Sequence, residues 1–112
     1  FDLAPFGIVG LETALPLTLK LVEEKVLTMS QLVECMSLNP ARVIMVDRGH
    51  LSVGSVADVT VFDPQLEWIV EREQLQSKSK NTPFLGSRLK GRATDVLCQG
   101  RVVMQGGKIV GR

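Results

Sequence analysis

GHLSVGSVADVTVFD, residues 49–63, marks the point where the sequence pattern changes from helical to β-type. It ends in a β-branched and aromatic run, Val59–Phe62, which is typical of a strand. Gly54 predicts a turn ahead of that strand, because glycine adopts backbone conformations that other residues avoid. The small side chain of Ala57 permits close packing, and the Asp58 carboxylate can accept hydrogen bonds from backbone amides where the strand begins.

The segment before this stretch has apolar residues at helical spacings. Between Leu11 and Val26 they recur every three or four positions, which predicts an amphipathic helix. Pro16 lies inside this span, so the helix either begins late, with Pro16 in its first turn, or is kinked there.

Two shorter helices are predicted next. Thr28 and Gln31 have the spacing of a capping box, which indicates a helix over residues 29–38. Asn39-Pro40 then offers an N-cap side chain followed by a proline at the first helical position, so we expect a third helix over residues 41–46.

The second half of the chain predicts short strands separated by turns. We expect the turn pair Asp63-Pro64 to end the first strand, and residues 77–89, rich in Lys, Ser, Asn, Pro and Gly, to form an extended loop. The remaining expected strands cover residues 68–70, 95–99, 101–105 and 108–110, with turns at Gly100 and Gly106-Gly107.

Composition restricts the possible functions. The 112 residues are 45% apolar, enough for a small folded core, and 13 basic against 12 acidic residues are interspersed along the chain. This balance argues against nucleic acid or a membrane as partner, and no apolar run approaches the ~20 residues of a spanning helix. Cys35 and Cys98 are far apart, and we expect two buried free thiols in a reducing cytoplasm.

Part of the fold is expected to lie outside this sequence. The chain begins with Phe1 rather than methionine, which suggests a piece of a longer protein. The predicted strands also carry apolar residues on both faces, so they need a partner sheet.

The stretch 49–63 resembles the G-x-L-x-x-G-x-x-A-D-x-x-x-x-D signature of the amidohydrolase superfamily. In that superfamily the segment belongs to a small β-sandwich, built from both chain ends, beside a (β/α)₈ barrel. The resemblance implies an α/β fold in which residues 1–47 are the end of the barrel, with its last loop and helices, and residues 48–112 are part of the sandwich. It also implies structural roles for Asp58 and Asp63.

A second segment is more specific. SKSKNTPFLGSRLKG, residues 77–91, is similar to the S-K-S-x-N-T-P-F-x-G-x-x-L-x-G stretch of bacterial dihydroorotases. Allantoinases and dihydropyrimidinases usually differ at the positions of residues 81–84. Taken alone, the four basic side chains of this region indicate a solvated loop; they are Lys78, Lys80, Arg88 and Lys90.

The third segment, APFGIVGLET, residues 4–13, resembles the A-P-x-G-I-x-G-x-E-T stretch that follows the last catalytic Asp in dihydroorotases. The resemblance implies that Pro5, Phe6 and Gly7 bind substrate. Gly7 suits this role because a residue without a Cβ lets its amide approach a ligand, and exposed amides suit an anionic group. From the residues alone, Pro5, Gly7 and Gly10 indicate a turn that precedes a helix rather than a binding site.

The resemblance implies zinc in the complete protein but none bound by this chain, and no catalytic residue here. His50 is the only histidine, whereas a hydrolytic zinc site takes three or more protein ligands. We therefore interpret His50 as a surface loop residue.

The activity implied for the complete protein is reversible cyclisation of N-carbamoyl-L-aspartate to (S)-dihydroorotate, in de novo pyrimidine synthesis in the cytoplasm, with this chain inactive alone. Two alternatives stay open: a non-catalytic dihydroorotase-like scaffold of aspartate transcarbamoylase, and another cyclic amidase such as allantoinase. The implied partners are the small-molecule substrate, the rest of the parent chain, a second copy in a homo-oligomer and aspartate transcarbamoylase.

Overall fold

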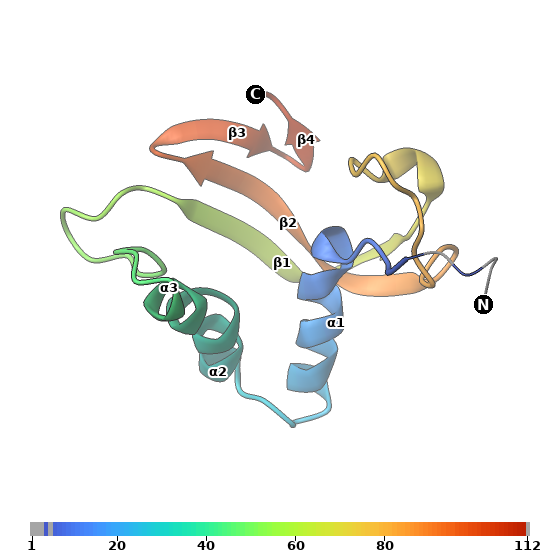
Figure 1. Ribbon diagram of the computed structural model, residues 1–112, viewed down its shortest axis with the longest axis horizontal. Coiled ribbons are helices and arrows are strands. Elements are labelled where there is room, and N and C mark those ends of the chain that lie inside the picture. Colours follow the sequence, from blue (N-terminus) through green and yellow to red (C-terminus); the bar gives the residue numbers. More distant parts are fainter. Residues whose placement is uncertain (1–3, 5, 112) are drawn as a thin grey trace.

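The computed structural model describes residue 4 and residues 6–111, with the helices first and an antiparallel sheet after them (Figure 1). The sheet has four strands in the order β1-β2-β3-β4. The helical elements are α1 (Leu11–Glu23), α2 (Met29–Val33), the π-helix η1 (Glu34–Leu38), α3 (Asn39–Val43) and the 3₁₀ helix η2 (Arg72–Gln74). The strands are β1 (Val59–Ile69), β2 (Arg88–Cys98), β3 (Arg101–Gln105) and β4 (Lys108–Ile109).

Helix α1 begins at Leu11, ahead of Pro16, so a late start at the proline is wrong. It also ends three residues before Val26. The chain turns at Lys25, which has a φ of 59°, and the Val26 amide folds back to the Leu21 carbonyl. A left-handed residue that returns amides to the last turn is a common way for a helix to end.

The capping box predicted for the second helix is confirmed. The Thr28 hydroxyl accepts from the Gln31 amide at 3.2 Å, and the Gln31 side chain accepts from the Thr28 amide at 2.8 Å. The Asn39 N-cap is wrong, because α2, η1 and α3 are contiguous and Asn39 has helical dihedrals. Its amide bonds the Glu34 carbonyl five residues back, and this wider π turn accommodates Pro40, which has no N–H to continue an α-helix.

Strand β1 runs through the predicted turn at Asp63-Pro64, so that prediction is wrong, as is a separate strand at residues 68–70. The register passes from Asp63 opposite Arg92 to Glu67 opposite Lys90, which leaves extra residues in β1 as a bulge. Pro64 cannot donate to the ladder, and a bulge is where a strand tolerates proline.

Strand β2 begins at Arg88, seven residues earlier than expected, because β1 pairs with its first half. The turn at Gln99-Gly100 has φ values of 51° and 78°, as in the primed turns that join strands tightly. Asp58 Oδ1 accepts from the Gln99 amide at 2.8 Å, which confirms its predicted role at the strand start. Ala57 is exposed, so close packing does not explain its small side chain.

Helix α1 packs against β2 at Gly91. Gly91 is buried, with a φ of 100°, and a Cβ there would lie 2.2 Å from Leu19 Cδ1. On the β1 side, Trp68 Nε1 donates to the Gly91 carbonyl at 3.0 Å, and the Arg92 guanidinium lies 4.8 Å from the Trp68 ring centre. A larger residue here would have to displace the end of the Leu19 side chain and keep a strained positive φ, so glycine suits this position.

The molecule exposes more surface than a compact domain of its size. Its accessible area is 8517 Å², against about 6,100 Å² for a folded monomer of this mass. Its radius of gyration is 15.5 Å, against about 13 Å for a compact chain of this length. Many large apolar side chains are exposed, among them Leu11, Val43, Met45, Leu51 and Val53. Apolar surface of this extent is typical of faces that pack against further structure.

The two cysteines are exposed free thiols, so the prediction that they are buried is wrong. Cys35 lies in η1, where residues 34–37 are all exposed, and Cys98 ends β2 beside the turn. Within the described residues, no helix has both the length and the apolar character that crossing a membrane requires.

We predict that Gly91→Ala lowers the unfolding free energy by about 2–4 kcal/mol, because the new methyl group collides with Leu19 and the residue keeps a positive φ. Gly86→Ala is the matched control, since Gly86 also has a positive φ, 78°, but open space around it. It should cost about 1–2 kcal/mol. Urea denaturation of the complete protein would measure both, and equal losses would show that the contact with Leu19 contributes nothing.

Candidate functional site

The loop before α1 exposes the residues implied to bind substrate. Phe6 is fully exposed and Gly7 is exposed with a φ of 73°, while Pro5 lies outside the described residues. No atom lies within 4 Å of the place where a Cβ of Gly7 would be. Among the described residues, no hydrogen bond is formed by the backbone N–H of Phe6 or that of Gly7. On these exposed residues, both N–H groups are candidates to meet a ligand.

Asn81 holds this loop from the far half of the chain. Its side-chain Nδ2 donates to the Gly7 carbonyl, and its own carbonyl accepts from the Val9 amide at 2.8 Å. The loop before α1 and the segment that contains Asn81 lie side by side in Figure 1. Two of the three motif segments, 4–13 and 77–91, thus form one structural unit.

Glu12 makes the second connection between these segments. Its carboxylate accepts from the Gln76 amide at 2.9 Å, the Ser77 amide at 3.0 Å and the Ser77 hydroxyl at 2.8 Å. Burial raises the pKa of the Glu12 carboxyl, but these hydrogen bonds together outweigh it. The charge of Lys80 lowers the pKa further, so it lies below its ordinary value of 4.5. The ionised carboxylate is the form that holds the segment.

The threonines of both motifs are packing residues. Thr13 and Thr82 are 2% and 7% exposed, and with Val9 and Leu75 they line the small enclosed space behind the loop. The Thr13 hydroxyl bonds the Gly10 carbonyl at 3.3 Å. Thr13 and Thr82, which the sequence analysis did not single out, therefore pack beneath the loop. Phe6 on the loop stays exposed.

The basic residues of the second motif are not all solvated loop side chains. Arg88 and Lys90 lie on β2 and form ion pairs with Glu67 at 3.5 Å and Glu23 at 3.2 Å. The Lys80 ammonium donates to the Leu75 carbonyl. Of these four basic residues, only Lys78 is the exposed loop residue that the sequence predicted.

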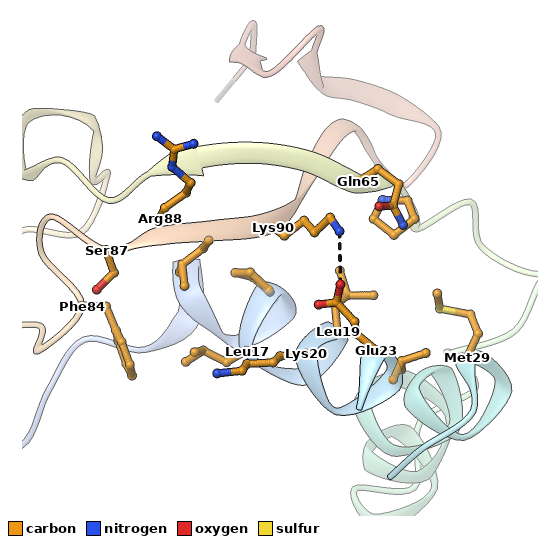
Figure 2. Close-up of a pocket in the computed structure, with 14 residues that line it drawn as sticks. Leu17, Leu19, Lys20, Glu23, Met29, Gln65, Phe84, Ser87, Arg88 and Lys90 are labelled. Carbon is orange, nitrogen blue, oxygen red and sulfur yellow. Dashed lines mark hydrogen bonds and ion pairs between the residues drawn. The ribbon is translucent and has the colours of Figure 1, made fainter. Parts of the chain in front are cut away.

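A groove of about 560 Å³ lies between α1 and β2, and residues 6–10 of the loop before α1 do not line it. Figure 2 shows Leu17, Leu19 and Phe84 along it, with the Lys90–Glu23 ion pair across it. Lys20 and Arg88 also line the groove, and the rest of its wall is largely apolar, so it offers mainly packing surface.

The described residues do not fit a metal. No group of three or more His, Cys, Asp or Glu side chains there could hold an ion. His50 Nε2 lies 2.6 Å from Asp47 Oδ1, and its Nδ1 lies 3.2 Å from Ser55 Oγ. Asp58 forms an ion pair with Arg48 at 3.0 Å. The side chains of His50 and Asp58 thus form hydrogen bonds and an ion pair within the loop ahead of β1.

The fold and sequence together define the family. A profile of the amidohydrolase family matches residues 2–103, and the chain belongs to that family. It is 59% identical to the dihydroorotase of Geobacter sp. (strain M21) over 107 residues, which are 96% of this chain and 25% of that protein. The chain thus spans about a quarter of the length of the curated relatives it matches.

Two solved structures show the same arrangement. L-Hydantoinase (dihydropyrimidinase) from Arthrobacter aurescens matches with a TM-score of 0.85 and 34% identity, over 96% of this chain and 24% of that chain. The inactive dihydroorotase-like domain of the CAD-like multifunctional protein of Chaetomium thermophilum matches with a TM-score of 0.68 and 27% identity, over 91% of this chain and 27% of that chain. The mixed helix and strand architecture is therefore an amidohydrolase fold.

We predict that Glu12→Gln loosens the segment around Gln76 and Ser77 in a pH-dependent way. Because the folded pKa is depressed, the carboxylate stabilises the fold at pH values above 4.5, and this contribution is lost as the pH falls through the lower folded value. At pH 7 the variant should show amide exchange at residues 76–77 faster by about tenfold. The difference should shrink below pH 4.5.

Hydrogen exchange read by mass spectrometry would check this. Glu24→Gln is the matched control, since Glu24 is exposed and makes only a 4.0 Å contact with Lys20. Equal exchange in both variants across the pH range would contradict the role of Glu12.

Proposed function

We propose that this chain is the C-terminal part of a dihydroorotase, which reversibly cyclises N-carbamoyl-L-aspartate to (S)-dihydroorotate in de novo pyrimidine synthesis. The observation that carries this proposal is the 59% identity to a dihydroorotase over nearly the whole chain. The hydantoinase with a TM-score of 0.85 is only 34% identical. The sequence therefore favours dihydroorotate over hydantoin as substrate.

We assign residues 1–47 to the end of the catalytic barrel and residues 48–112 to the β-sandwich. Support comes from the antiparallel sheet and from the exposed apolar side chains, which suit burial against the rest of the protein. The partner of these faces is then the remainder of the parent chain.

Within this assignment, Pro5, Phe6 and Gly7 form the substrate loop. The amides of the exposed residues Phe6 and Gly7 can donate to the carboxylate of dihydroorotate, and the open space at Gly7 permits a close approach. The family's zinc would polarise the amide carbonyl of the substrate. We expect its ligands and the catalytic Asp to come from the rest of the parent chain; in support, the described residues hold no group of three or more His, Cys, Asp or Glu side chains that could bind an ion.

A second candidate is a non-catalytic scaffold of aspartate transcarbamoylase. The likeness to an inactive dihydroorotase-like domain favours it, because this part of the fold is kept in a protein without the activity. The sequence ahead of Phe1 decides between the two: an active enzyme has His-x-His and Asp-His-Ala-Pro-His there, and a scaffold lacks them. A cytoplasmic homo-oligomer fits both proposals.

We predict that the complete protein turns over dihydroorotate, and that allantoin and dihydrouracil react at least 100-fold more slowly, since a site built for a carboxylate leaves buried donors unpaired with substrates that lack it. Steady-state kcat/KM values for the three substrates would test this. Faster turnover of allantoin would identify another cyclic amidase, and no turnover of any of them would favour the scaffold.

We also predict that this chain, purified alone, neither hydrolyses dihydroorotate nor retains stoichiometric zinc. A zinc site of this chemistry takes three or more protein ligands, and the described residues do not assemble such a set. Metal analysis and a dihydroorotate assay on the 112-residue chain would test it. Turnover with one bound zinc per chain would contradict the assignment of the ligands to the rest of the protein.

A further inference from the structure

We propose that Asn81 is a positioning residue for substrate binding: it sets the conformation of the Phe6–Gly7 loop from within the predicted sandwich portion. The proposal deepens the proposed function and rests on it. It assigns a role in substrate affinity to a residue that does not itself contact the substrate.

The argument begins with Gly7. Glycine has the largest backbone freedom of any residue, and Gly7 has a φ of 73° with no packed neighbour at the Cβ position. The loop therefore cannot hold this conformation by its own side-chain packing. An external restraint must select one orientation of its peptide groups.

Asn81 supplies that restraint on both sides of Ile8. Its Nδ2 fixes the direction of the Gly7 carbonyl, and its own carbonyl fixes the Val9 amide at 2.8 Å. Because one residue donates through its side chain and accepts through its backbone, the two contacts act as a pair. The two contacts hold the Gly7–Ile8 and Ile8–Val9 peptide groups, so the Phe6–Gly7 peptide is attached to a held segment and samples fewer orientations than in a free loop.

Further hydrogen bonds hold Asn81 and its segment in place. Glu12 anchors Gln76 and Ser77 at one end of the segment, and the Ser79 hydroxyl accepts from the Asn81 amide at 3.3 Å. A ligand loop supported by a second layer of hydrogen bonds loses less entropy when it binds. Asn81 is half-buried and its bond to Gly7 is exposed, so this bond closes no part of the core.

The test is Asn81→Asp in the complete protein. Aspartate keeps the size and the backbone contact with Val9, but its carboxylate cannot donate to the Gly7 carbonyl. Because the loop binds substrate and transition state alike, KM for dihydroorotate should rise about tenfold, with kcat changed less than about threefold. Asn39→Asp makes the same chemical change at an exposed position on α3 and should leave both constants unaltered.

Asn81→Ala repeats the test without the added charge and should shift KM in the same direction. Unchanged KM in both variants, or a joint fall of kcat and thermal stability at unchanged KM, would overturn the positioning role while leaving the proposed function intact. No dihydroorotate turnover by the unaltered protein would instead overturn the proposed function, and the positioning role with it.

Discussion

The close approach of α1 to β2 at Gly91 is the constraint on which the rest of the structure depends. Leu19 occupies the space that a side chain at this position would fill, so the helix lies directly on the strand. The loop at residues 6–10 leads into α1, and the segment at residues 76–87 leads into β2. Holding the two elements together at one glycine therefore places their leading segments against each other, which is where Glu12 and Asn81 make their hydrogen bonds.

The types of element were predictable from the sequence, but several of their ends were not. The capping box at Thr28 was read correctly because both partners lie within one turn of helix. Asp63-Pro64 and Asn39-Pro40 are also strong local signals, yet both were misread. At Asp63-Pro64 the strand continues as a bulge because it pairs with β2. At Asn39-Pro40 the helix continues through a π turn. Local preference gave way to long-range pairing in the strand and to helix continuation at the proline.

The candidate site was predictable only in parts. Segments 4–13 and 77–91 could each be matched to one family, but nothing in their spacing indicates that they touch. The contacts that join them span 64 to 74 residues, and the decisive one uses a side-chain amide against a backbone carbonyl. The available signal was the presence of Glu12, Ser77 and Asn81 within the family motifs. The sequence did not indicate the partners of these polar side chains, which lie within the chain itself.

The length of these connections also bears on the order of folding. Closing loops of 64 to 74 residues costs chain entropy before their contacts return any stabilisation. The helices and the tight β2–β3 hairpin can form from neighbouring residues, so the loop at Phe6 and Gly7 should reach its final geometry among the last events. A partly folded molecule would then hold its helices and hairpin before the loop proposed to bind substrate reaches its shape, so under that proposal ligand binding would report completed folding of both halves.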